Sequence, residues 1–247
     1  MCDASGSPLT MLTPHRVGLE VRYWREVTEQ TPIAGEEVII HADADLVVAD
    51  KPHFLPVAPT GEWVEQTLLR RLQNRLGVDA LAPLHRIDRT TAGLVMFSVN
   101  PKTRAAYHDL FRLRRIGKVY HALAPPLPEQ QFPLTRRSHL TRGTPFFRIE
   151  ETPGEPNAET RIEVLTRGSR LWRYELRPHT GHKHQLRVHM AALGAAIDGD
   201  TYYPVLLQAA ADNYARPLSL LAHSVSFRDP LSGISRSFTT SLKLSAS

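Results

Sequence analysis

An aspartate stands between two arginines in the stretch Leu84–Leu94, which reads LHRIDRTTAGL. Arg86 and Arg89 would keep Asp88 ionised at neutral pH, because an opposite charge within a few ångströms lowers the pKa of a carboxylate. The apolar run Leu94–Phe97 predicts a buried strand, so the acid would lie at the mouth of a rigid element, as a catalytic group requires. On these residues alone, Asp88 is either a reactive carboxylate or one member of an ordinary surface ion pair.

Histidines and cations gather in a second stretch, Thr180–His189, where a turn precedes a short helix with Leu186 and Met190 on one side. Neutral imidazole is a common metal ligand, so a metal site is one interpretation of His179, His182, His184 and His189. Their spacing is not that of a familiar metal site, no cysteine is near, and a metal ion would be repelled by Arg177, Lys183 and Arg187. We therefore expect no metal, and basic groups placed for a phosphate or a carboxylate, aided by backbone donors at the helix start.

The composition indicates a folded globular protein. The chain has 247 residues, of which 42% are hydrophobic and 22% charged, and no apolar run reaches bilayer length. The N-terminal residues lack the basic start and apolar core of a signal peptide, and Cys2 is the single cysteine, so we expect a cytoplasmic protein without internal disulfides. A net charge of +5 favours a polyanionic partner such as nucleic acid, although the same excess could serve solubility.

Elements that could position Asp88 flank it on both sides. The β-branched runs Glu37–His41 and Leu46–Asp50 predict a hairpin, and the apolar spacing over residues 62–76 predicts a helix. Asn100-Pro101 then predicts the start of a second helix, whose inward residues would be Ala106, Leu110 and Leu113. Nearly all its charges are positive, which indicates a phosphate contact or a solvated face: Lys102, Arg104, Arg112, Arg114, Arg115 and, just beyond, Lys118.

The second half of the chain alternates strands and turns. Strands are predicted at Gly117–Leu123, Phe146–Glu150, Thr160–Thr166, Arg170–Arg177, Leu218–Phe227 and Ser235–Leu242. The proline- and glutamine-rich segment Pro125–Pro133 would join two lobes. Trp172, Tyr174 and Leu176 share one face of their strand, which favours a half-buried antiparallel sheet. Many antiparallel strands with a few helices predict an α+β fold.

Four stretches, in this order, resemble the RluA-like pseudouridine synthases, which isomerise selected uridines in structured RNA. They are Asp45–Pro52, similar to the family's opening strand with lysine-proline; His85–Leu94, similar to its signature loop; Lys118–Ala122, similar to its lysine-x-tyrosine-x-alanine strand; and Thr180–His189, continued by Gly199, Asp200 and Tyr202. Weaker likenesses are Asn157–Thr160 and Leu221–His223 with Phe227 and Pro230. The chain departs from the family's pattern at Thr90–Ala92, His182-Lys183 and Gly194–Ala196, which bears on substrate preference more than on the reaction.

The resemblance implies the pseudouridine synthase fold: a mixed, mostly antiparallel central sheet flanked by helices, with an active-site cleft between two lobes. It implies a catalytic domain over residues 36–247, with lobes joined near 124–143. Residues 1–35 would be an N-terminal extension, too short for the family's frequent extra RNA-binding module. Asp88 would be the catalytic carboxylate. Four further residues would handle the substrate. Arg86 would fill the gap left by the flipped base, and Tyr120 would stack on the uracil or assist proton transfer. Leu186 would pack against the pocket, and Arg187 would orient Asp88.

The activity implied is that of an RNA pseudouridine synthase, which flips a uridine out of rRNA or tRNA, cleaves its glycosidic bond and rejoins the base through carbon. By this resemblance we expect structured RNA as the partner, no cofactor, no metal, no membrane and a monomer. Two alternatives stay open: a non-catalytic RNA-binding or RNA-chaperone protein on the same fold and, more distantly, a metal-dependent hydrolase.

Overall fold

The computed structural model describes residues 1–23, 30, 32–207 and 212–244. The chain divides into two compact units, Met1–Thr31 and Pro32–Ser247. In the first unit, β1 (Cys2–Asp3) pairs antiparallel with β2 (Val21–Arg22), so the segment 17–24 contains a short strand; Trp24 lies outside the described residues. No helix of the described part is long and apolar enough to cross a bilayer.

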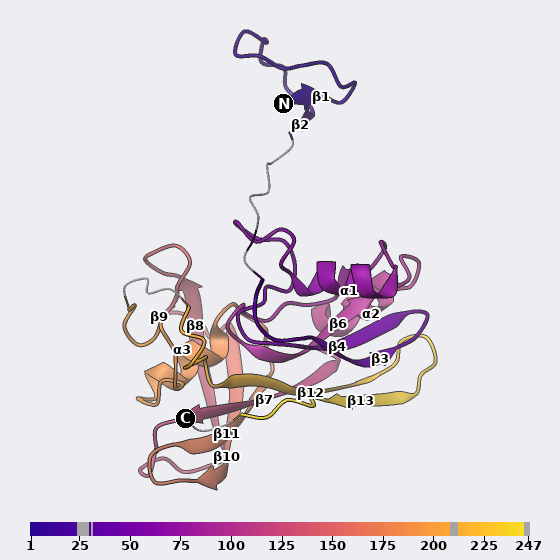
Figure 1. The fold of residues 1–247 in the computed structure, drawn as a ribbon. Helices are drawn as coiled ribbons and strands as arrows, with labels where there is room; N and C mark the ends of the chain where they lie inside the picture. The colour runs from indigo at the N-terminus through magenta and orange to yellow at the C-terminus, as the bar shows by residue number, and fades with distance from the viewer. Residues whose placement is uncertain (24–29, 31, 208–211, 245–247) are drawn as a thin grey trace. The chain divides into compact units, whose positions relative to one another are not determined.

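The second unit is built on one large sheet of eleven strands, counted among the described residues (Figure 1). They are β3 (Val38–Ala42), β4 (Leu46–Lys51), β5 (Ala82–Pro83), β6 (Ala92–Ser98), β7 (Ile116–Ala124), β8 (Leu134–Arg142), β9 (Ile149–Thr152), β10 (Ala158–Arg167), β11 (Trp172–Pro178), β12 (Leu220–Arg228) and β13 (Ser235–Thr239). The order is β3-β4-β6-β12-β7-β11-β10-β8-β9, with β5 on β6 and β13 on β12. All pairs are antiparallel except β6 with β12, which confirms the mixed, mostly antiparallel sheet of an α+β fold.

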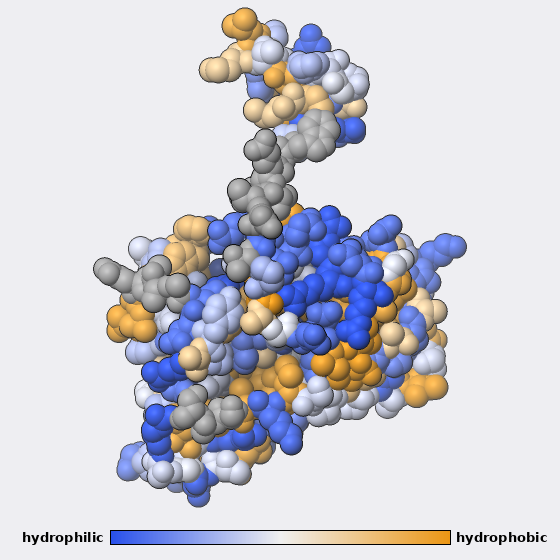
Figure 2. All heavy atoms as spheres, in the orientation of Figure 1, coloured by the Kyte–Doolittle hydropathy of each residue, from blue (hydrophilic) through white to orange (hydrophobic). Residues whose placement is uncertain are grey.

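Three helices cover parts of this sheet: α1 (Leu68–Leu76), α2 (Arg104–Arg112) and α3 (Gln185–Ala192). Strands β4 and β6 are buried on both faces. Alternate residues of these strands enter two cores, one shared with Leu68 and Leu72 of α1 and the other with Tyr107 and Leu110 of α2. The polar side of α1, with its exposed Arg75, contributes to the hydrophilic face drawn in Figure 2. The strand that follows Asp88 is therefore clamped from both sides.

The third core explains the alternation predicted over Arg170–Arg177. Trp172, Tyr174 and Leu176 point from β11 to one side, where they pack with Leu186 and Met190 of α3. This helix covers the half of the sheet that contains β7, β10 and β11. Because the apolar side of α3 packs on the sheet, the polar residues of the stretch Thr180–His189 are held on a rigid support.

The only parallel pair among the described strands joins the two halves of the sheet. Ala92 lies opposite Leu221, and Gly93 opposite Ala222. Gly93 has a φ of 105°, and a Cβ at this position would collide with the backbone of Ala222. Only glycine combines this conformation with so close a backbone approach. The glycine that ends the Asp88 loop is therefore needed where the two halves meet.

Several predicted boundaries were wrong. Helix α1 begins at Leu68 and not at residue 62, because Thr67 caps it by accepting a hydrogen bond from the Arg70 N–H. Leu113 is 41% exposed instead of inward, since α2 ends at Arg112. A strand that the sequence does not predict, β8, forms the second part of the segment 124–143 and pairs with β9 and β10. The strand predicted at Phe146–Glu150 begins only at Ile149.

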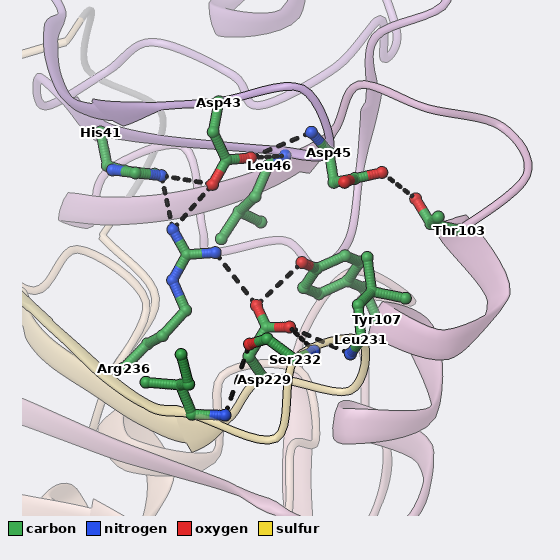
Figure 3. A network of polar contacts seen from close by, with 11 residues as sticks. His41, Asp43, Asp45, Leu46, Thr103, Tyr107, Asp229, Leu231, Ser232 and Arg236 are labelled. Carbon is green, nitrogen blue, oxygen red and sulfur yellow. Dashed lines mark hydrogen bonds and ion pairs between the residues drawn. The ribbon is translucent and has the colours of Figure 1, made fainter.

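A polar network ties β13 to the β3–β4 turn (Figure 3). The Arg236 guanidinium donates hydrogen bonds to Asp43 at 2.8 Å and to Asp229 at 3.0 Å. Asp229, which is 4% exposed, also accepts a hydrogen bond from the Tyr107 hydroxyl of α2 at 3.0 Å. Burial would raise the pKa of Asp229, but hydrogen bonds from the Ser232 N–H and from Arg236 outweigh it and lower this pKa to about 2. Arg236 thus links β13 to the β3–β4 turn directly and to α2 through Asp229.

Replacing Arg236 with methionine is expected to lower the free energy of unfolding by about 2 kcal/mol, because the buried Asp229 loses a charged hydrogen-bond donor. The pKa of Asp229 is depressed in the folded state. Its carboxylate therefore contributes its full stabilisation above the pKa it has in the unfolded chain, about 4. That contribution disappears as the pH falls towards about 2. Urea unfolding at several pH values measures both effects. The matched control is Arg112→Met, which removes an exposed arginine paired with Asp109 and should unfold close to the parent. A difference from the parent that does not shrink at low pH would contradict this role.

Candidate active site

A cavity of about 990 Å³ opens at the end of the β6–β12 junction, a size suited to a nucleotide-sized group. Residues from both halves of the sheet line it. These include all five site residues predicted from the sequence: Arg86, Asp88, Tyr120, Leu186 and Arg187. They come from the loop before β6, from β7 and from α3. The fold thus brings together residues that are far apart in the chain.

The loop that carries Asp88 is hydrogen-bonded to Lys51, the last residue of β4, and to His53, two residues later. The ammonium of Lys51 is fully buried and donates hydrogen bonds to the carbonyls of Arg89 and Pro52, each at 3.0 Å. The His53 ring donates through Nδ1 to the Thr90 carbonyl at 2.7 Å. Burial lowers the pKa of Lys51 to about 7, a shift that the charge of nearby Asp88 opposes. For Lys51, the sequence leaves a structural role or a phosphate contact open; its hydrogen bond to the Arg89 carbonyl holds the backbone just after Asp88 and favours the structural role.

Asp88 faces Arg187 across the cavity. Oδ2 of Asp88 and Nη1 of Arg187 are 3.3 Å apart, although the two residues are 99 positions apart in the chain. Arg187 is 3% exposed and donates two shorter hydrogen bonds to Asp200, at 2.8 and 2.7 Å. Burial would lower the pKa of Arg187, but the hydrogen bonds and charge of Asp200, with that of Asp88, raise it. The cation is therefore permanent, and its tightest contacts leave Asp88 only loosely held.

His184 is the second group near Asp88. Its Nε2 lies 3.8 Å from Oδ1 of Asp88, and its Nδ1 is 3.0 Å from the Tyr203 hydroxyl. Burial lowers the pKa of His184 to about 4, against the attraction of Asp88, so the ring is neutral at pH 7. Arg187 is therefore the cation in contact with Asp88. The neutral His184 ring forms part of the cavity wall and turns a polar nitrogen towards Asp88.

The two arginines that flank Asp88 in sequence do not pair with it. Arg89 turns away and forms a bidentate pair with Asp212, at 2.6 and 2.5 Å. Its guanidinium also lies 5.6 Å from the ring of Trp63. Arg86 is exposed at the cavity and has no ion pair within the described part of the chain. Neither flanking arginine therefore forms an ion pair with Asp88 in the described part of the chain, whereas the prediction of Arg187 as its partner agrees with the geometry.

Tyr120 and Leu186 form apolar walls of the cavity. Burial, together with the negative charge of Asp88, raises the pKa of Tyr120, so its hydroxyl stays protonated at neutral pH. No hydrogen bond to that hydroxyl is present among the described residues. A ring next to Asp88 with a protonated hydroxyl can stack on a base and can also donate a hydrogen bond.

The basic residues around α2 are not one continuous face. Arg104 donates to the Ala80 carbonyl at 2.5 Å, and Arg112 is paired with Asp109. Only Arg114 and Lys118 line the cavity, and the Lys118 ammonium donates to the Thr180 carbonyl at 3.0 Å. Arg114 and Lys118 are therefore the two cations of this set that could contact a phosphate at the cavity.

The clustered histidines point to different partners. His189 lies between the hydroxyls of Ser138 and Thr160, at 3.0 and 2.9 Å, and His182 donates to the Asn157 carbonyl at 2.9 Å. Across the described ranges, no three potential metal-ligating side chains converge. His182 thus ties the turn before α3 to the segment before β10, and His189 ties α3 itself to β8 and β10.

With this geometry established, comparison with known proteins identifies the family. Residues 45–192 match the sequence model of the RNA pseudouridylate synthases. The chain belongs to the RNA pseudouridylate synthase family. The match begins at β4 and ends at the last residue of α3, so it contains the Asp88 loop, Tyr120 and Arg187. The activity of the family, isomerisation of uridine in RNA, is the activity of an isomerase and not that of a hydrolase.

Several relatives are RNA pseudouridine synthases by name. One from Synechocystis is 28% identical over 211 residues, covering 81% of this chain and 70% of the relative. One from Haemophilus influenzae is 30% identical, covering 67% and 72%. Pseudouridylate synthase RPUSD2 of Mus musculus is 30% identical over 70% of this chain, but the aligned part is 32% of that longer protein. The family's shared part is thus the sheet with its cavity.

Solved structures show the same fold. Human RNA pseudouridylate synthase domain containing 1 has a TM-score of 0.69 at 23% identity, covering 85% of this chain and 86% of that one. Human RNA pseudouridylate synthase domain containing 4 has a TM-score of 0.65 at 24% identity, covering 84% and 88%. At this identity the likeness concerns the fold, and it confirms the predicted pseudouridine synthase architecture.

Two residues of the site were missed in the sequence. Asp200, fully buried against Arg187, belongs to a glycine-aspartate pair that the family motif contains, so the signal was present but no role was drawn from it. Asp212, the partner of Arg89, lies in a segment without any motif. Its pairing became apparent only from the fold.

Proposed function

We propose that Asp88 is the catalytic carboxylate of this RNA pseudouridine synthase. The observation that carries the proposal is the unequal sharing of Arg187 between two acids. Arg187 gives its bidentate contact to the buried Asp200 and a single 3.3 Å contact to Asp88, which is 24% exposed to the cavity. Asp88 is thus oriented by a fixed cation while its lone pairs remain available to a substrate.

The proposed reaction begins with a uridine flipped out of the RNA into the cavity, at a cost of a few kcal/mol. Arg86, exposed and unpaired within the described chain, would fill the space that the base leaves. Tyr120 would stack on the uracil, and Leu186 would pack against it. Phosphates would be attracted to the rim cations Arg114 and Lys118.

Asp88 then acts on the sugar, as a nucleophile at C1′ or as a base, and the C1′–N1 bond breaks with its electron pair on N1. The uracil turns within the cavity and its C5 bonds to C1′. This step breaks the bond between Asp88 and C1′ on the nucleophile route; on the base route, Asp88 returns the proton that it took from the sugar. The proton on C5 is lost and N1 gains one, so that the product is an isomer of the substrate and no oxidant or other co-reactant is consumed. Because a water molecule would intercept the intermediate, the walls formed by Tyr120 and Leu186 must keep the site dry.

We propose rRNA or tRNA as the substrate. Relatives named tRNA pseudouridine(32) synthase and tRNA pseudouridine(31) synthase of Saccharomyces cerevisiae, at 29% and 28% identity, support this class. Mapping of pseudouridine across all cellular RNA, with and without the gene, tests it. We expect one or more uridines in rRNA or tRNA to lose the modification in the absence of the gene. Unchanged maps, together with RNA binding by the purified protein, would favour a non-catalytic RNA-binding protein.

Removal of metal ions is expected to leave the activity unchanged. The proposed steps use Asp88 and the substrate's own atoms. His182 bonds to a carbonyl, and His184 and His189 bond to hydroxyls. Activity on an RNA transcript should be the same after dialysis against EDTA, with a zinc enzyme treated in parallel as a control for chelation. Activity lost with EDTA and restored by added Zn²⁺ would return attention to the histidines of Thr180–His189.

A further inference from the structure

Aromatic rings continue from the site to the surface along one side of the cavity. Tyr202 lies 4.8 Å from the Arg187 guanidinium. The Phe147 ring is 5.4 Å from that of Tyr202, and both residues line the cavity. Phe146 follows at 5.7 Å from Phe147, and 73% of it is exposed. The row thus runs from the partner of Asp88 to open solvent.

Hydrogen-bonded turns hold the rings at both ends of the row. Phe146 and Phe147 lie in the turn between β8 and β9, where the Gly143 N–H donates to the Arg148 carbonyl and the Arg148 N–H to the Pro145 carbonyl. At the other end, the Tyr202 N–H donates to Asp200 at 2.8 Å. The rings are therefore positioned before any ligand arrives.

Unneutralised cations accompany the rings. The Arg148 guanidinium lies 5.1 Å from the Tyr203 ring and donates to the Pro204 carbonyl at 3.1 Å. Lys183 is exposed at the cavity rim. Neither is paired with a carboxylate anywhere in the described ranges. Rings for stacking and cations for phosphate are the two components that bind unpaired nucleotides.

We propose that Phe146, Phe147 and Tyr202 form a subsite that stacks an unpaired base next to the flipped uridine. This inference rests on the proposed function, since it assumes that the uridine itself lies at Asp88. It specifies the substrate further: the target uridine lies in a loop or other single-stranded segment, where a neighbouring base is free to leave its stack. A uridine inside a continuous helix would not supply such a base.

The test uses RNA hairpins whose loop holds one uridine, with the fluorescent base 2-aminopurine on its 3′ side in one hairpin and on its 5′ side in another. Stacking is tolerant of sequence, so these probes serve without knowledge of the natural target. Binding to the full chain is expected to quench the fluorescence of one of the two. Phe146→Ala and Phe147→Ala should each reduce the quench and weaken RNA binding roughly 10-fold, whereas Phe147→Trp should retain both.

Ile234→Ala is the matched control, because this apolar residue is 66% exposed but does not line the cavity. Because 73% of Phe146 is exposed, its variant is expected to unfold close to the parent temperature. Absence of quench at both positions, or equal quench in Phe146→Ala and the parent, would overturn the subsite. The fluorescence experiment measures binding and not turnover. Failure of the proposed subsite is therefore distinct from failure of Asp88 as the catalytic group, which is tested by measuring activity.

Discussion

Asp88→Asn is expected to reduce pseudouridine formation by ~10³-fold or more, the scale on which loss of a central catalytic group acts. Asparagine has nearly the same shape and can still accept the hydrogen bond of Arg187, but it has no negative charge and is a poor nucleophile and base. Release of tritium from RNA labelled at uridine C5 measures the reaction, because that hydrogen leaves during isomerisation. RNA affinity should stay within a few-fold of the parent, since the rim cations and the aromatic walls are unchanged.

The matched control is Asp79→Asn, which makes the same change at an exposed position that does not line the cavity. Its activity should equal that of the parent. If Asp88→Asn retains more than about a tenth of the parent rate, a loss of only ~1.4 kcal/mol in transition-state stabilisation, the carboxylate is not the catalytic group. Unchanged binding with lost turnover also separates this protein from an RNA chaperone, for which Asp88 would have no special importance.

Arg187→Met is expected to affect both stability and activity. Asp200, fully buried and paired with Arg187 at 2.7 Å, would remain as an uncompensated charge, which costs about 3–5 kcal/mol of unfolding free energy. Asp88 would lose its orienting cation at the same time. Arg187→Lys should recover only part of the stability, because an ammonium cannot reproduce the two-pronged contact of a guanidinium. Urea unfolding and tritium release measure the two effects.

A double variant separates the two roles of Arg187. In Arg187→Met with Asp200→Asn, the buried negative charge is absent, so stability should return towards the parent, as a double-mutant cycle would show. Activity should stay low, because Asp88 still lacks its partner. Recovery of activity along with stability would mean that Arg187 serves the fold and does not orient Asp88.

Much of the fold could be predicted because its signals are local. The β3–β4 hairpin, the buried strand β6 and the apolar face of β11 follow from residue types and their alternation. Strand β8 was missed because its sequence, LTRRSHLTR, is polar at most positions. Its place in the sheet is decided by pairing with β9 and β10, a non-local effect that composition does not reveal.

The site was predictable to the extent that motifs carried it. The pairing of Asp88 with Arg187 was inferred from two motifs, although the flanking arginines are nearer in sequence. Backbone direction decides against those neighbours: Arg89 points to Asp212, and Arg86 points to the cavity mouth. Arg187 instead comes from a buried helix that can hold its guanidinium in place. Asp212 could not be inferred, since a single acid in a segment without a motif gives no indication of its partner.

The parallel pairing of β6 with β12 also has a consequence for biosynthesis. Ala92 meets Leu221, so the element that supports the Asp88 loop is completed only by a strand far along the chain from it. A ribosome making this protein must therefore release β12 as well as β6 before the cavity can close. Contacts of such long sequence separation also slow folding. The nascent chain would meet cellular RNA first as an unassembled, basic polypeptide, and acquire its selectivity for uridine last.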